Sequence, residues 1–114
     1  MAVDITDPED KKLVVLARAT RARTGAAAGA ALRDLDGRTY AGATVDLPSL
    51  RVSALGVCIA MAVASGAKGA EAVVVLGDGQ PGPEDLAALL EFAGPGVPAH
   101  VGTPNGAIAA TLTS

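Results

Sequence analysis

Residues 29–46 read GAALRDLDGRTYAGATVD, two runs of small and apolar residues on either side of a charged turn. The Asp-Gly pair at 36–37 supplies the positive φ that a tight hairpin requires, so residues 26–33 and 38–45 are predicted as paired strands. Their side chains are short, which lets other backbone segments approach closely. We therefore expect this hairpin to lie in a closely packed core.

Helices and further strands are predicted on both sides of this hairpin. Thr6 or Asp7 can cap a first helix, Pro48 and Ser49 break the second strand before a loop, and Ser53 can cap a second helix. Helices that alternate with strands predict a sheet covered by helices on both faces. The expected elements are a helix over 8–23, the two strands, a helix over 54–65, a strand over 72–76, a helix over 83–92, and strands over 97–102 and 107–112.

The helix predicted over residues 54–65 is apolar on every side, since Leu55, Val57, Ile59, Met61 and Val63 fall on different faces. Such a helix must be buried on most sides. We expect the sheet to cover one side and a second subunit to cover the other, in a homo-oligomer. The alternative is a monomer in which the sheet alone covers the helix.

Composition narrows the class of protein. The chain has 114 residues, a net charge of −3, one cysteine and one histidine. These values predict one domain over residues 1–114, a reducing cytoplasmic setting, and no nucleic-acid or membrane partner. The basic residues of the first helix follow acidic Asp7, Glu9 and Asp10, so they are interpreted as a solvated helix face.

Several motifs are similar to those of the small cytidine deaminases. Residues 29–32 resemble the family's Gly-Ala-Ala-Leu strand, residues 36–40 its hairpin, residues 42–46 its sugar-binding segment, and residues 89–92 its final helix. The resemblance covers about four-fifths of the chain. It implies a cytidine deaminase-like α/β/α fold with three layers and a mixed five-stranded sheet. It also implies a homotetramer whose pockets lie between subunits.

The catalytic positions depart from this resemblance. The family begins its central helix with Cys-Ala-Glu, where this chain has Leu55, Gly56 and Val57. Its second signature, Pro-Cys-x-x-Cys, falls where this chain has Gly82 and Asp85. The zinc positions are therefore Leu55, Gly82 and Asp85, and the position of the proton-shuttling glutamate is Val57. We expect no zinc, no other cofactor and no catalytic residue.

The sugar-binding positions are altered less. The family's asparagine and glutamate fall on Thr44 and Asp46, which can still hydrogen-bond and carry charge. The resemblance therefore makes Thr44 and Asp46 the candidate ligand-binding residues. The expected ligand is a nucleoside-like small molecule.

Other chemistry is open on the residues alone. Cys58 could act as a nucleophile with His100 as base. Alternatively, Cys58 could be a small buried thiol and His100 a structural or surface histidine. Asp78, Glu84 and Asp85 could bind a hard cation, or they could serve the start of a helix. The glycines around Asp78 lack the lysine and the spacing of a phosphate loop.

Taken together, the residues and the resemblance favour a protein that has lost deaminase activity. We expect a dimer or tetramer with a structural or regulatory role, or one that binds a nucleoside-like ligand or a partner protein. The alternative is an active cytidine or nucleoside deaminase-type hydrolase with an altered site.

Overall fold

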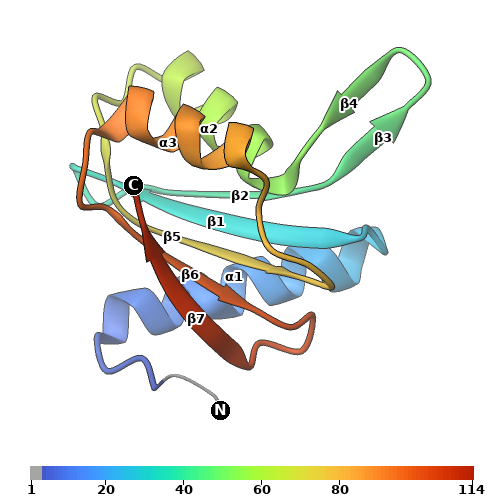
Figure 1. The fold of residues 1–114 in the computed structure, drawn as a ribbon, viewed down its shortest axis with the longest axis horizontal. Helices are drawn as coiled ribbons and strands as arrows, with labels where there is room; N and C mark the ends of the chain where they lie inside the picture. Colours follow the sequence, from blue (N-terminus) through green and yellow to red (C-terminus); the bar gives the residue numbers. More distant parts are fainter. Residues whose placement is uncertain (1–3) are drawn as a thin grey trace.

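The computed structural model describes residues 4–114 and arranges them in three layers around one main sheet (Figure 1). Helix α1 (Pro8–Thr24) covers one face of the sheet. Helices α2 (Ala54–Ala64) and α3 (Pro83–Ala93) lie on the other face. The predicted α/β/α architecture is confirmed. None of the helices in the described part of the chain has the length and hydropathy needed to span a bilayer.

The main sheet is mixed and has five strands in the order β2-β1-β5-β6-β7. Only β5 and β6 run parallel, and every other pair is antiparallel. The elements agree with the predicted ranges to within three residues. The strand bounds are β1 Ala28–Asp34, β2 Thr39–Ala43, β5 Ala70–Gly77, β6 Pro98–Gly102 and β7 Ile108–Thr113.

A second, smaller hairpin follows β2 and was not predicted. Strands β3 (Val45–Leu47) and β4 (Leu50–Val52) form a separate two-stranded sheet, the arm, which projects from the body (Figure 1). Pro48 and Ser49 do break the strand, but they form the turn that brings Leu47 opposite Leu50. The prediction of one strand over 38–45 followed by a loop was therefore wrong beyond residue 43.

Two apolar clusters fill the space between the layers, one on each face of the sheet. On the α1 face the helix lies very close to β1 at Gly29. A Cβ atom there would come within 2.6 Å of the Arg21 Cβ, so no larger residue fits without moving the helix. Alanine and valine form much of both clusters, as expected for a core almost without aromatic rings.

A polar network on the α1 face joins the helix to the sheet. Asp10 is buried, and its two carboxylate oxygens lie 2.9 Å from Arg33 Nη2 and 2.9 Å from His100 Nε2. His100 Nδ1 lies 2.8 Å from Thr111 Oγ1. Burial works against ionisation of Asp10, but the hydrogen bonds to His100 and Arg33 prevail and lower the pKa of its carboxyl. Asp10 is thus a buried anchor, whereas most of the basic residues that follow it on the helix are exposed, as predicted.

The Asp10 anchor can be tested by substitution. Asp10→Ala leaves the buried His100 and the half-buried Arg33 each short of a partner, so the free energy of unfolding should fall by about 2–4 kcal/mol. Urea denaturation measures the loss. Glu9→Ala is the matched control, because Glu9 pairs with Lys12 in solvent and its loss should cost less than about 1 kcal/mol. Equal losses for the two variants would contradict the anchor.

The contribution of Asp10 to the free energy of unfolding depends on pH. The folded-state pKa of Asp10 lies below its usual value of 3.8, so its stabilisation is complete above pH 3.8. It is lost as the pH falls through the lowered pKa. The stability difference between the natural protein and Asp10→Ala should therefore shrink as the pH falls below 3.8.

Candidate functional site

A hollow of about 350 Å³ opens where α2 and α3 begin, next to the loop that follows β5. The three positions that the resemblance assigns to zinc ligands, Leu55, Gly82 and Asp85, all line this hollow. Segments some thirty residues apart along the chain are thus brought together as the resemblance implies. The polar side chains of its wall are Thr44, Ser53, Asp78, Gln80, Glu84 and Asp85.

The side chains at these three positions do not fit a zinc ion. Leu55 offers only hydrocarbon and is fully buried, and Gly82 has no side chain. Asp85 alone carries a donor atom, whereas a catalytic zinc site takes three protein ligands. Within residues 4–114, no group of three histidine, cysteine or acidic residues could hold a metal ion.

A hydrogen bond joins the two helix starts instead. The Ser53 hydroxyl donates to Asp85 Oδ1 at 2.6 Å, and its oxygen accepts the Gly56 N–H at 3.0 Å. Ser53 therefore caps α2 as predicted and also holds the first turn of α3. Its second role was missed, since no local pattern connects residues 53 and 85. The only signal for this contact was the resemblance, which assigns Asp85 and residue 55, close to Ser53 in the chain, to one site.

The two candidate ligand-binding residues lie in different places. Thr44 lines the hollow, and its Oγ1 accepts the Ala28 N–H at 3.1 Å. Asp46 is on the arm, exposed, with Oδ1 3.4 Å from Arg51 Nε, and it does not line the hollow. Of the two, only Thr44 lines the hollow.

The wall of the hollow is acidic. Asp78, Glu84 and Asp85 line it, and no lysine, arginine or histidine of the described chain does so. Glu84 and Asp85 are in the first turn of α3, where carboxylates stabilise a helix. This agrees with the prediction that the acidic residues serve the start of a helix. A site of this charge disfavours phosphate and favours ligands with N–H and O–H donors.

Val57, at the position of the family's glutamate, packs away from the hollow. It lies against the edge strand β2, where a Cβ atom on Gly42 would come within 2.9 Å of Val57 Cγ1. Gly42 thus permits α2 to approach the sheet. Val57 is a packing residue in this structure and not part of the wall.

Cys58 and His100 lie on opposite faces of the sheet. Cys58 is fully buried in the cluster under α2, and burial raises the pKa of its thiol to about 12. His100 contacts Asp10 and Thr111 on the α1 face. The structure therefore does not form a nucleophile–base pair, and the buried-thiol reading of Cys58 fits the geometry.

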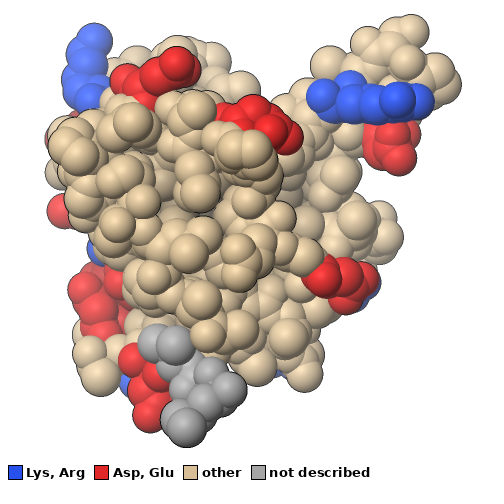
Figure 2. Space-filling model, in the orientation of Figure 1, with Lys and Arg blue, Asp and Glu red and all other residues tan. Residues whose placement is uncertain are grey.

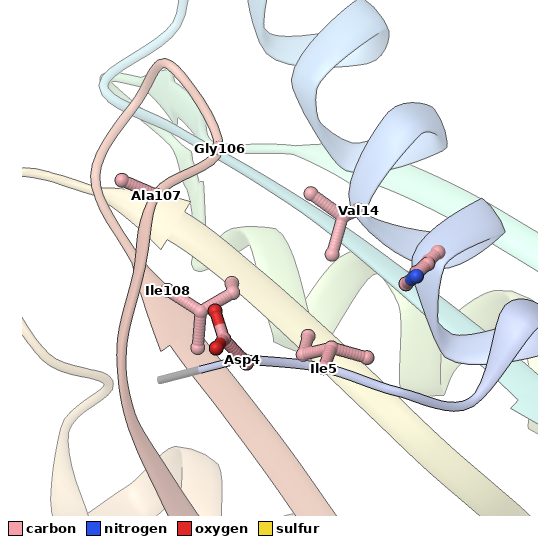
Figure 3. A pocket seen from close by; sticks show the side chains of 7 residues that line it. Asp4, Ile5, Val14, Gly106, Ala107 and Ile108 are labelled. Carbon is pink, nitrogen blue, oxygen red and sulfur yellow. The ribbon is translucent and has the colours of Figure 1, made fainter. Parts of the chain in front are cut away.

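Another hollow, of about 310 Å³, lies between α1 and the start of β7 (Figure 3). Ile5, Val14 and Ile108 point toward it from three segments, and all three belong to the α1-side cluster or pack against it. Its wall contains none of the residues singled out by the resemblance. The hollow lies where Ile5 packs against the α1-side cluster.

Comparison with known proteins agrees with this geometry. A family model described as cytidine deaminase-like matches residues 6–106. No curated protein matches the sequence.

Solved structures with a similar fold include three bacterial cytidine deaminases. The Mycobacterium leprae enzyme is 26% identical over 94% of both chains, with a TM-score of 0.73. The Burkholderia pseudomallei enzyme is 22% identical over 90% of this chain and 91% of that chain, with a TM-score of 0.80. The Mycobacterium tuberculosis enzyme is 23% identical over 82% of this chain and 85% of that chain, with a TM-score of 0.71.

The burial of Cys58 predicts slow thiol chemistry. In the folded protein, Cys58 should react with an aromatic disulfide reagent far more slowly than in urea, because the thiol is enclosed and stays protonated near neutral pH. Absorbance during labelling measures both rates. Fast labelling of the folded protein would show that the thiol is accessible.

The contact between Gly42 and Val57 predicts a coupled pair. Gly42→Ala should lower the free energy of unfolding by about 1–3 kcal/mol, because the added methyl overlaps Val57. In the double variant with Val57→Ala, the loss should be smaller than the sum of the two single losses, since removal of Val57 Cγ1 relieves the closest of the overlaps. Additive losses in urea denaturation would show that the two residues are not in contact.

Proposed function

This chain belongs to the cytidine deaminase-like family, and on that premise we propose that it has lost the deaminase reaction and acts as an oligomeric structural or regulatory protein. One observation carries the proposal. The three zinc positions meet at one hollow as hydrocarbon, glycine and a carboxylate bound to Ser53. These groups cannot hold the ion that activates water in the family.

The same hollow is proposed to bind a neutral, nucleoside-like molecule. Its volume of about 350 Å³ falls in the range of small-ligand pockets. Thr44, Ser53 and Gln80 offer hydrogen-bonding groups, and the carboxylates of its wall can accept hydrogen bonds from sugar hydroxyls or a base amino group. The lack of a cation in the described wall argues against a nucleotide's phosphate.

Assembly is proposed to use the outer face of α2. This helix carries no charged residue, and Ala60, Val63 and Ala64 are exposed on it. Small residues allow a second helix to pack closely, and the buried area would stabilise a dimer or tetramer by roughly 25 cal/mol per Å². A reducing, cytoplasmic setting suits the single buried thiol.

Metal and activity assays test the loss of chemistry. We expect the purified protein to hold no stoichiometric zinc and to release no ammonia from cytidine. Stoichiometric zinc together with ammonia release would establish the alternative, an active hydrolase with an altered site. The triple variant Leu55→Cys, Gly82→Cys, Asp85→Cys is the positive control, because it should gain one zinc per chain in the same assay.

Thermal-shift measurements with nucleosides and nucleotides test whether the hollow binds a ligand. Nucleosides at about 100 times their Kd should stabilise the fold by about 2.7 kcal/mol, and the 5′-monophosphates should bind more weakly. Thr44→Val should reduce the shift, whereas Asp46→Asn, outside the hollow, should not. No shift with any nucleoside would leave only the structural or regulatory role.

A further inference from the structure

Thr111 holds its hydroxyl against a buried histidine. It is exposed on β7, the strand at one edge of the sheet, and its Oγ1 lies 2.8 Å from Nδ1 of His100 on β6. The other ring nitrogen, Nε2, lies 2.9 Å from Oδ2 of Asp10 on α1. His100 and Asp10 are both buried. A surface hydroxyl, an imidazole and a carboxylate therefore form one hydrogen-bonded line from the solvent into the α1 side of the sheet.

The charge on Asp10 decides which nitrogen of the ring is protonated. Burial opposes ionisation of Asp10, but the hydrogen bonds to His100 and Arg33 lower the pKa of its carboxyl below 3.8, so the group is ionised at neutral pH. An ionised carboxylate can only accept hydrogen bonds, so Nε2 must carry the shared proton. In the neutral ring, Nδ1 then holds a lone pair and the Thr111 hydroxyl donates to it. The proton of this hydroxyl thus points at a base.

The backbone N–H of Thr111 points to the free edge of the sheet. No strand of the described chain lies beyond β7, and the Ser114 N–H donates inward to the Val97 oxygen. Inward and outward groups alternate along an antiparallel strand, so the N–H of Thr111, three residues before Ser114, points outward. A carbonyl group that approaches Thr111 from this edge can therefore receive a hydrogen bond from that N–H, which would stabilise an oxyanion formed on attack.

A bulge in β7 places the hollow of Figure 3 on the same face as Thr111. Ile108 pairs with Gly102, and the pairing then skips Ala109. Without the extra residue, positions 108 and 111 would face opposite sides of the sheet. Instead, Ile108 joins the apolar cluster under α1, about 10 Å along the strand from Thr111 on that same side. The hollow therefore offers space for an apolar group attached to a carbonyl at Thr111.

We propose that Thr111 is a nucleophile for acyl transfer, with His100 as its general base and Asp10 as a positioning residue. The substrate class is an uncharged ester with an apolar acyl group. Figure 2 shows uncharged side chains over the middle of the face where Figure 1 places β7, and the strand itself carries no charged residue. The acyl group would occupy the hollow at Ile108.

The reaction balances with water as its only co-reactant. Oγ1 of Thr111 bonds to the acyl carbon while its proton passes to Nδ1 of His100. The imidazolium, held by Asp10, gives this proton to the alcohol oxygen as the ester C–O bond breaks, and the acyl group stays on Thr111. Water then attacks the acyl carbon and gives a proton to Nδ1. The bond to Oγ1 breaks, Thr111 takes that proton back, and the carboxylic acid leaves.

The site on β7 is separate from the hollow where α2 and α3 begin. Asp10 and His100 lie on the α1 face of the sheet, whereas α2 and α3 lie on the other face (Figure 1). The ester reaction does not rest on the loss of deamination, so the two proposals fail independently. Its histidine is the one considered in the sequence as a base for Cys58, and only the structure shows that its partner is a threonine.

Hydrolysis of p-nitrophenyl butyrate by the purified protein tests the proposal. We expect release of p-nitrophenol above the buffer rate, and a butyryl group on Thr111 in peptide mass spectrometry after an acid quench. Thr111→Val should lower the release to the buffer rate, whereas Thr111→Ser should retain it because the hydroxyl remains. Thr113→Val is the matched control and should change nothing, because Thr113 is exposed on the same face but lies opposite Pro98 instead of a histidine.

Two further variants test the base and the positioning residue. His100→Gln keeps hydrogen-bonding groups but has no base, so the release should fall about a hundredfold or more. Asp10→Asn can offer its amide N–H to Nε2, which moves the ring proton to Nδ1 and removes the base. It should therefore lower kcat and leave KM unchanged, a result that a merely structural role would not give. Urea denaturation confirms that each variant is folded under the assay conditions.

The remaining outcomes overturn the proposal. Release at the buffer rate by the natural protein would show that the hydroxyl is not a nucleophile. Release that Thr111→Val leaves unchanged, or a butyryl group on another residue, would place the reaction elsewhere. Equal losses for Thr111→Val and Thr113→Val would trace the effect to the packing of β7 instead of to the hydroxyl.

Discussion

The close approach of helices to the sheet is the constraint on which the rest of this structure depends. At Gly29 the backbone of β1 leaves no room for a single methyl group beneath α1, and at Gly42 the same is true beneath α2. With only two aromatic residues in the chain, the layers are filled mostly by short side chains. Such packing leaves little space between layers, so the main polar hollow forms where α2 and α3 begin.

That hollow has a wall whose side chains do not suit a metal ion. Leu55, Gly82 and Asp85, the positions that the resemblance assigns to metal ligands, all line it. The hydrogen bond from Ser53 to Asp85 connects the starts of α2 and α3. The two helix starts are therefore tied together without a metal ion, as the proposed loss of the reaction requires.

Local signals in the sequence were enough for most of the fold. Asp-Gly at 36–37, the helix caps and the uninterrupted apolar run of β5 each act over a few residues, and the elements they predicted are present. The arm was missed because Pro48 and Ser49 indicate a break without showing that the chain returns beside itself. At the site, the family resemblance predicted that residues 55, 82 and 85 lie close together. The resemblance did not predict that Asp46 lies outside the hollow that Thr44 lines, because this depends on how the arm projects.

Asp10 shows why other features lie beyond local reasoning, and it also bears on the order of folding. Its partner His100 is 90 residues away along the chain. During synthesis α1 leaves the ribosome first, yet it cannot complete this contact until β6 has emerged and paired with β5. Contacts of such long sequence separation slow folding. The last polar contact of the first helix therefore closes only when β6 is in place, even though β1 and β5 offer the helix a surface to pack on earlier.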